Sequence, residues 1–276
     1  MIDIHCHLLP GLDDGAKTIE EALEIAAQLY EAGFKTVIAT PHVIEERNHL
    51  TLEKILEATD QLNEMLRARG IPMVVLPGAE NYIFPDMARW LTKGKLLTLG
   101  NMGKYFLVEL PMQEIPHYTD QVFFELQVAG VTPVLAHPER NKGLVEEPER
   151  ISAWAERGVL FQVDLRSLSG RYGPEAERFG GSMLECGLVH FIGTDAHRVA
   201  QSEDAYRYEL RHLGGRLDPR YFEALTRYNP QKILDGASIE TEMDFDFTLG
   251  IEKFENKSPR GIFFSWGKKL RALFGR

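Results

Sequence analysis

Seven short apolar runs, each separated from the next by a helix-length segment, constrain the fold of this chain more than any other feature. The runs span residues 1–4, 36–39, 73–76, 105–108, 132–136, 160–163 and 190–193. Strands that alternate with helices in this order favour a parallel sheet, either closed as a barrel or open and covered on both faces. The sequence therefore predicts an α/β fold built from repeated strand–helix units.

Local signals mark where the predicted helices begin and end. Thr18 and Glu21 have the spacing of a capping box, and Gly33 follows the apolar period of residues 22–30. Gly70 and Gly187 are expected to end two further helices in the same way. Neither of the common glycine-rich phosphate loops occurs in the sequence, which argues against the usual nucleotide-binding folds.

Histidines and acidic residues stand where six of the seven predicted strands end. Parallel barrels place their active sites at the carboxyl ends of the strands, so these side chains are expected to meet. Side chains two residues apart in an extended chain point to the same side. The two residues of the His-x-His pair, and those of the Asp-x-His pair, can therefore reach the same ion. With an aspartate from the glycine-rich turn 10–15, the candidate metal ligands are His5, His7, Asp14, His42, Glu80, Glu109, His137, Asp195 and His197.

Nine candidate ligands are too many for one tetrahedral ion and are enough for a cluster of two or three ions. Imidazole and carboxylate ligands without thiolate favour manganese, iron or zinc. With three divalent ions, the four carboxylates would leave a charge of about +2, which complements the charge of a phosphomonoester, roughly −1.5 to −2 at pH 7.

Two arginines lie close to the candidate ligands and suit phosphate binding. Arg140 follows His137 by three residues, and Arg198 directly follows His197. A guanidinium group can bind two phosphate oxygens at once, so both arginines are candidate catalytic residues. The alternative for either one is an ordinary surface ion pair.

Charge and cysteine content exclude several classes of function. The net charge of −10 argues against a general nucleic-acid binder, which needs clustered basic residues. Two cysteines make no disulfide framework, and the N-terminal residues do not have the pattern of a signal peptide, so a cytoplasmic protein is expected. Cysteine-dependent phosphatases need an arginine six residues after the nucleophile, but Leu12 follows Cys6 and Ile192 follows Cys186 at that spacing.

The motifs, taken together, resemble one protein family. They are IDIHCHLLPGLDDG at 2–15, TPH at 40–42, GAE at 78–80, VE at 108–109, AHPER at 136–140 and GTDAH at 193–197. Residues 1–237 resemble the PHP (polymerase and histidinol phosphatase) superfamily, and within it the bacterial capsule-type, CpsB/YwqE-like protein-tyrosine phosphatases.

The resemblance implies a distorted seven-stranded parallel (β/α) barrel with three metal ions and manganese-dependent hydrolysis of phosphotyrosine. Its pattern implies three ligand sets: His5, His7, Glu80 and Asp195; Glu80, Glu109 and His137; and Asp14, His42 and His197. Arg140 matches the family's substrate arginine, and Arg198 is the nearest match to a second one. We expect a hydroxide held between two ions to attack phosphorus. The implied substrates are tyrosine-rich tails of kinases that govern exopolysaccharide export.

Three other functions remain open from the residues. Another phosphomonoesterase of the superfamily, such as a histidinol phosphatase, would have almost the same ligands. An amidohydrolase barrel also begins with His-x-His, but it normally has eight units and takes histidines from two middle strands. A non-catalytic module that binds metal or a partner is the third alternative.

The sequence divides into a phosphatase barrel at 1–237 and an extension at 238–276. Residues 238–257 carry six acids against two lysines, whereas 258–276 carry five basic residues and no acid. The basic stretch has apolar residues at helical spacing, which predicts a short amphipathic helix. Such a helix could lie on an anionic membrane surface, or its apolar side could pack on the barrel or on a neighbouring subunit in an oligomer.

Overall fold

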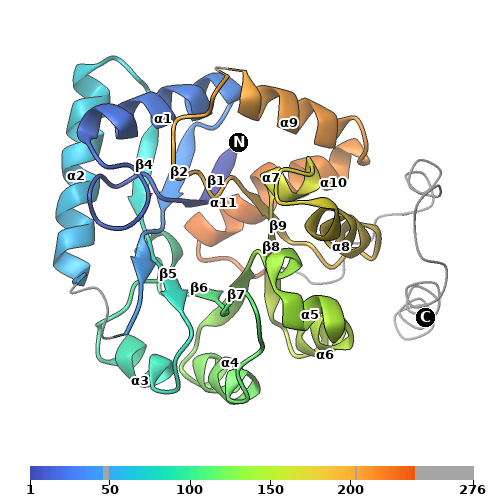
Figure 1. The fold of residues 1–276 in the computed structure, drawn as a ribbon. Helices are drawn as coiled ribbons and strands as arrows, with labels where there is room; N and C mark the ends of the chain where they lie inside the picture. The colour runs from blue at the N-terminus through green and yellow to red at the C-terminus, as the bar shows by residue number, and fades with distance from the viewer. Residues whose placement is uncertain (46–49, 203, 240–276) are drawn as a thin grey trace.

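The computed structural model describes residues 1–45, 50–202 and 204–239. Strands occupy the centre of the molecule, and helices surround them on the outside (Figure 1). No helix in this described part of the chain is both long and apolar enough to cross a membrane. The amphipathic helix expected at 258–276 and most of the predicted extension lie outside the described residues.

All strand pairings are parallel, as the strand–helix order predicts. One sheet has the order β1-β2-β4 and the other the order β3-β5-β6-β7-β8-β9. The strands are β1 (Ile2–Cys6), β2 (Thr36–Ala39), β3 (His42–Val43), β4 (Val74–Pro77), β5 (Glu80–Tyr82), β6 (Tyr105–Glu109), β7 (Thr132–Ala136), β8 (Leu160–Asp164) and β9 (Phe191–Gly193).

The described residues contain nine strands, whereas the sequence predicted seven. Two predicted strands continue past a short break into a second strand: β2 continues into β3, and β4 into β5. Pro41 interrupts the first because it has no N–H to donate to a ladder. Gly78 interrupts the second, where an added Cβ would lie 2.7 Å from Cγ2 of Ile38. His42 and Glu80 therefore lie on the second segments instead of following a strand end.

The first and last strands lie side by side (Figure 1). A parallel bridge joins Cys6 to Ala196, and the backbone N–H of His7 donates to the carbonyl of Ala196 at 3.0 Å. The backbone N–H of Asp195 donates to the carbonyl of His5 at 2.9 Å. These bonds bring the candidate ligands after the first strand next to those after the last strand.

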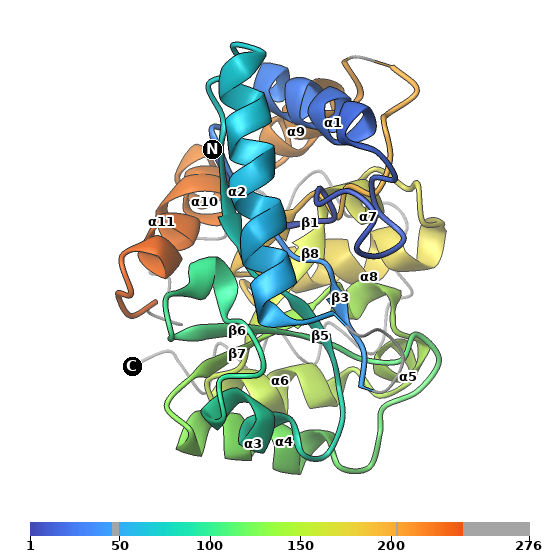
Figure 2. The same cartoon turned by 90° about the vertical axis from the view of Figure 1, so that its left-hand side faces the viewer.

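The helices follow the strands in the predicted order and enclose them in both views (Figures 1 and 2). They are α1 (Ile19–Ala32), α2 (Leu52–Ala68), α3 (Met87–Thr92), α4 (Thr119–Val128), α5 (Lys142–Glu146), α6 (Glu149–Glu156), α7 (Leu165–Leu168), α8 (Pro174–Glu185), α9 (Ala205–Gly214), α10 (Pro219–Glu223) and α11 (Asn229–Leu234). Short 3₁₀ turns occur at Leu99–Asn101 and Pro138–Arg140, and a π-helical turn at Ala224–Tyr228.

The predicted boundaries of α1 are confirmed. The hydroxyl of Thr18 accepts a hydrogen bond from the backbone N–H of Glu21, and Gly33 ends the helix with a φ of 107°. Gly70 and Gly187 likewise follow α2 and α8 with positive φ angles. A residue at the helix end that tolerates φ > 0 lets the chain reverse into the next strand.

Two apolar cores hold the strands and helices together. The larger core packs the helices against the outer side of the strands. The smaller core contains residues of six strands together with Leu99 and Ile233, so it fills the space that the strands enclose. Side chains above this smaller core, at the carboxyl ends of the strands, are mainly polar, and they form the site described next.

Candidate metal centre

The nine predicted ligands lie together at the carboxyl ends of the strands, linked by a continuous series of short contacts. His5 lies on β1, His42 on β3, Glu80 on β5 and Glu109 on β6, and the others lie in the loops after β1, β7 and β9. The strand register places His42 opposite Glu80 on the neighbouring strand. Parallel pairing thus brings residues far apart in the sequence to one edge.

Four ligand atoms converge at the buried end of the centre. The Nε2 atoms of His5 and His7 are 3.2 Å apart. Oε2 of Glu80 lies 3.3 and 3.2 Å from them, and Oδ1 of Asp195 lies 3.4 and 3.3 Å from them. These four residues are the first ligand set that the resemblance implies.

Glu80 connects the other ligands through both carboxylate oxygens. Oε2 lies 2.9 Å from Nδ1 of His42, and Oε1 lies 2.8 Å from Nε2 of His137. Nδ1 of His42 is also 3.4 Å from Oε2 of Glu109. His42, Glu80 and Glu109 therefore form a compact group, and His137, which the expected second set includes, contacts the other oxygen of Glu80.

The third group lies towards solvent. Oδ1 of Asp14 is 3.5 Å from Nε2 of His42 and 3.3 Å from Nε2 of His197. The ring of His7 stacks on that of His197 with centroids 3.8 Å apart, so His7 also borders this group. The Asp14 side chain is 66% exposed. This side of the centre is therefore open to solvent.

Asp13 and Gln162 orient the ligands and were not among the predicted site residues. Oδ2 of Asp13 lies 2.7 Å from Nδ1 of His7 and accepts a hydrogen bond from the backbone N–H of His42. Oε1 of Gln162 lies 2.7 Å from Nδ1 of His5. Each contact turns the other ring nitrogen, Nε2, towards the centre, as the partners of metal-binding histidines commonly do.

Arg140 lies beside this centre and is held by two carboxylates. Its Nη1 donates to Oδ2 of Asp195 at 2.7 Å and to Oδ2 of Asp164 at 2.9 Å. Asp164 was missed, although it ends β8 and follows the same strand-end pattern as the predicted ligands. Arg198 is exposed, and within the described residues no hydrogen bond or ion pair joins it to the centre.

Two of the predicted ligands lie on strained backbone. His137 has a φ of 31° and Asp195 a φ of 47°, both in the left-handed region that residues other than glycine rarely occupy. Such strain is concentrated at functional sites, where the surrounding structure holds it in place. Here the contacts of Asp195 with Arg140 and His5 fix its carboxylate, and Glu80 fixes His137.

Burial and neighbouring charges oppose each other in setting the pKa values of the centre. Burial lowers the pKa of His42, but its close contacts with the Glu109 and Glu80 carboxylates outweigh burial and raise the pKa to about 10. Burial also lowers the pKa of His137, and its bond to Glu80 raises that pKa to about 10. Although burial favours protonation of Glu80, the positive charge of His5 and bonds from His137 and His42 hold its pKa well below the usual range. Its carboxylate therefore stays ionised, and positive charge beside it stabilises this buried anion.

The donor set fits divalent cations. Oε2 of Glu80 and Oδ1 of Asp195 are buried, and imidazole nitrogens lie within 3.5 Å of both, but among the described residues no donor is aligned for a hydrogen bond to either oxygen. An unsatisfied buried carboxylate oxygen is costly, and a cation removes that cost. Imidazole nitrogens and carboxylate oxygens at this spacing are ligands that manganese, iron and zinc accept.

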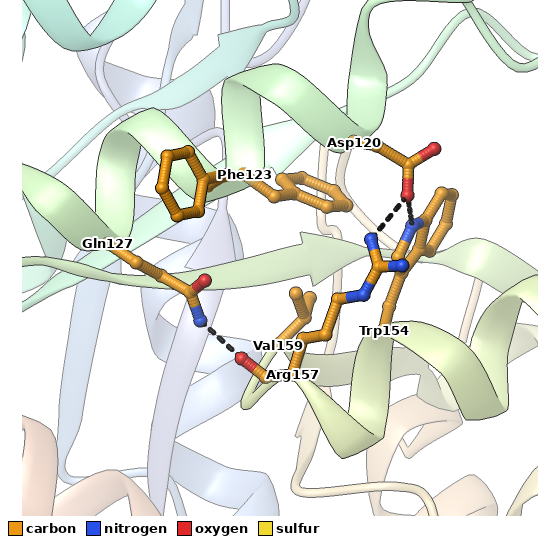
Figure 3. Close-up of a pocket in the computed structure, with 7 residues that line it drawn as sticks. Asp120, Phe123, Gln127, Trp154, Arg157 and Val159 are labelled. Atoms are coloured by element: carbon orange, nitrogen blue, oxygen red, sulfur yellow. Dashed lines mark hydrogen bonds and ion pairs between the residues drawn. The ribbon is translucent and has the colours of Figure 1, made fainter.

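A separate surface pocket lies between α4 and α6, away from the metal centre (Figure 3). Phe123 and Trp154 line it, and the carboxylate of Asp120 accepts hydrogen bonds from Trp154 and Arg157. None of the nine predicted ligands lines this pocket.

Comparison with known proteins agrees with this geometry. The sequence pattern of the family described as "Capsular polysaccharide synthesis, CpsB/CapC" matches residues 1–235. The chain belongs to the CpsB/CapC family. Among the members of this family, the tyrosine-protein phosphatase YwqE of Bacillus subtilis is 41% identical over 199 residues, which cover 72% of this chain and 78% of that protein.

The tyrosine-protein phosphatase CpsB of Streptococcus pneumoniae is 29% identical over 85% of this chain and 98% of that protein. A solved structure from a study of YwqE and CpsB, described there as unique metal-dependent tyrosine phosphatases, matches with a TM-score of 0.81 and 36% identity. That match covers 87% of this chain and 96% of the solved one. The expected CpsB/YwqE-like family and the parallel α/β fold are thereby confirmed.

Proposed function

We propose that the protein is a metal-dependent protein-tyrosine phosphatase that hydrolyses phosphotyrosine side chains of a protein substrate. The observation that carries this proposal is the convergence of nine imidazole and carboxylate side chains beside Arg140. The CpsB/CapC relatives named as tyrosine phosphatases support the same reaction.

We propose three divalent ions, most readily manganese, with iron or zinc as alternatives. The ligand sets are those implied by the resemblance, with His42 also placed to contribute beside Glu80 and Glu109. Bound divalent ions lower the pKa of water and neutralise negative charge on a phosphoryl group. The four ligand carboxylates would offset most of the charge of three such ions and leave about +2, which complements the charge of a phosphomonoester.

The side chains around the ions position the substrate. Arg140 has N–H groups on Nη2 and Nε for phosphate oxygens, while Asp164 and Asp195 hold its Nη1. A cation in this position neutralises charge that develops on phosphoryl oxygens during hydrolysis. Asp13 and Gln162 fix the rings of His7 and His5, so the ligands need little rearrangement. Arg198 stays a second candidate for substrate contact.

Cys6 is not placed to act as a nucleophile. It is fully buried, and burial raises the pKa of its thiol well above the ordinary value. The thiolate, not the thiol, is the reactive form, so this side chain is inert at neutral pH. Its Sγ lies 3.6 Å from the carbonyl of Ala196, and it packs in the larger apolar core.

Membership of the family supports a proposal about the wider setting. We propose that residues 1–237 form the catalytic unit, a distorted seven-stranded barrel in which β2 with β3 and β4 with β5 each count as one strand position. The substrate would be a tyrosine-rich kinase tail involved in exopolysaccharide synthesis, and the enzyme would work in the cytoplasm.

A substrate panel tests the proposed function. Manganese-loaded protein should hydrolyse phosphotyrosine peptides at a higher kcat/KM than phosphoserine peptides or histidinol phosphate, and a chelator should abolish the activity. A preference for histidinol phosphate would favour the alternative phosphomonoesterase. Activity that survives chelation, or a phosphocysteine trapped by acid quench, would exclude the proposed chemistry.

A further inference from the structure

One aromatic side chain lies against the arginine that is proposed to bind phosphate. The guanidinium carbon of Arg140 is 4.2 Å from the ring centroid of Tyr172. Tyr172 is 39% exposed, so its ring covers one face of the guanidinium and still presents surface to solvent. Because Arg140 contacts Asp195, this exposed ring borders the metal centre.

The turn that carries Tyr172 is held in place. It connects α7 to α8, and Gly170 and Gly173 adopt φ angles of 77° and 94° at its two sides. The backbone N–H of Arg171 donates to the carbonyl of Arg166, and Nε of Arg171 donates to Oε1 of Glu209 on α9. The ring is therefore a fixed wall and needs little ordering when a ligand arrives.

The free donors of Arg140 place a substrate next to this wall. Among the described residues, both hydrogen bonds of the guanidinium come from Nη1. A guanidinium has five N–H donors, so Nη2 and Nε remain for phosphate oxygens. Because the Tyr172 ring lies 4.2 Å from the guanidinium carbon, the organic group of a phosphate ester bound to these donors would lie within reach of that ring.

We propose that Tyr172 is a specificity-determining residue whose ring contacts the aromatic ring of an aryl phosphate, an inference that rests on the proposed function. Aromatic pairs with centroids 4.5–7 Å apart stabilise each other beyond simple burial. A short alkyl phosphate ester gains no such contact. The ring is what matters, since the Tyr172 hydroxyl has no hydrogen bond within the described part of the chain.

Binding of two phosphonates to manganese-loaded protein, measured by calorimetry, tests this proposal without any turnover. Tyr172→Leu should weaken phenylphosphonate by about threefold to tenfold, the range expected for one aromatic pair, and leave methylphosphonate within twofold. Tyr172→Phe and Tyr172→Trp should both keep the preference for phenylphosphonate. Tyr208→Leu, at an exposed tyrosine on α9, is the matched control and should change neither affinity.

Metal content and melting temperature of each variant establish that it is folded and loaded. Equal losses for both phosphonates in Tyr172→Leu would overturn the proposal, because the ring would then serve only to hold Arg140. Loss of the preference in Tyr172→Phe would also overturn it. A different result would overturn the proposed function and leave this inference intact: the wild type would bind phenylphosphonate with this preference but would not hydrolyse phosphotyrosine peptides.

Discussion

At the scale of single residues, the proposal gives some side chains to metal binding and others to substrate binding. His42 and His137 both contact Glu80, and His42 also lies within 3.5 Å of Asp14 and Glu109, all of them candidate ligands. Arg140 makes its two hydrogen bonds to carboxylates at the margin of the ligand group. Substitutions at these positions should therefore have different signatures.

His42→Ala and His137→Ala should each remove most of the turnover because each variant loses part of an ion's ligand set. Arg140→Ala should lower kcat/KM for aryl phosphates while the metal content stays near that of the wild type. Elemental analysis of the purified variants beside steady-state kinetics makes the comparison. Loss of metal in Arg140→Ala would contradict its assignment to the substrate.

Asp164→Asn should raise the KM for aryl phosphates and lower kcat/KM by about tenfold, since a hydrogen bond between charged groups contributes about 1.5–3 kcal/mol. The carboxylate of Asp164 accepts hydrogen bonds from Arg140 and Gln162, and among the described residues it makes none with a predicted metal ligand. Metal content should be unchanged. Asp120→Asn, at the pocket between α4 and α6, is the control and should leave KM unaltered. An unchanged KM in Asp164→Asn would argue against this positioning role.

At the scale of secondary structure, the close approach of β9 to β1 shapes the buried end of the centre. A Cβ added at Gly193 would lie 2.9 Å from Cβ of His5 and 2.7 Å from Nε2 of Gln162. Such distances are too short for ordinary contact, so the strands fit together only because this position has no side chain.

Gly193→Ala should therefore destabilise the protein by roughly 1–3 kcal/mol, the usual cost of overpacking. It should also reduce activity, because the displaced atoms belong to His5 and its partner Gln162. Gly214→Ala in α9 is the control: its Cβ would find only ordinary contacts of 3.6 Å or more, and alanine favours the helix. Chemical denaturation of both variants compares them, and equal stabilities would refute the packing argument.

At the scale of the whole molecule, the ligands come from seven separate strands and loops, so ion binding should be linked to global stability. Without ions, Glu80, Glu109 and Asp195 face one another in a largely buried space. Ions that bind only the folded state stabilise it, by about 2.7 kcal/mol per site at a hundredfold excess over Kd.

Chelation should thus lower the melting temperature by roughly 5–10 °C per ion lost, given about 2–4 °C per kcal/mol for a domain of this size. Added Mn²⁺ should restore it. Differential scanning calorimetry with and without a chelator gives the shift. A melting curve that the chelator leaves in place would rule out a multi-ion site coupled to the fold.

His190 should make the stability of the whole fold depend on pH. Burial outweighs a backbone hydrogen bond at Leu188 and lowers the pKa of His190 to about 4, from an ordinary value of 6.5. The unfolded chain therefore binds more protons between these values, and the stability supplied by neutral His190 is full above pH 6.5 and is lost as the pH falls towards 4. At pH 5.5 the loss amounts to about 1.4 kcal/mol.

His190→Gln should reduce the fall in stability between pH 7.5 and 5.5 by about that amount. Its amide oxygen can still accept from the backbone N–H of Phe161, as Nδ1 of His190 does. Both proteins are unfolded with urea in excess chelator, so that no ion is bound. The metal ligands titrate in the same way in both, and their contribution cancels in the difference between the two proteins. The same pH dependence in both proteins would show that His190 is accessible to protons in the folded state.

The sequence by itself determined the strand–helix order, several helix ends and which candidate ligands would lie together. These features are local: a strand needs a short apolar run, α1 needs Thr18 and Gly33 at its ends, and a parallel fold brings every strand end to one edge. The pattern therefore located even Glu80 and His42, although each lies on a short extra strand that the pattern did not predict.

Only the tertiary structure decided how the ligands group and what supports them. Glu80 reaches His42 with one oxygen and His137 with the other, and this depends on the break at Gly78 and on strand register. Asp13 and Gln162 are distant in sequence and meet the same centre only after folding. No local pattern encodes the contact of Gln162 with His5, because the strand pairings that position it arise only when the strands assemble.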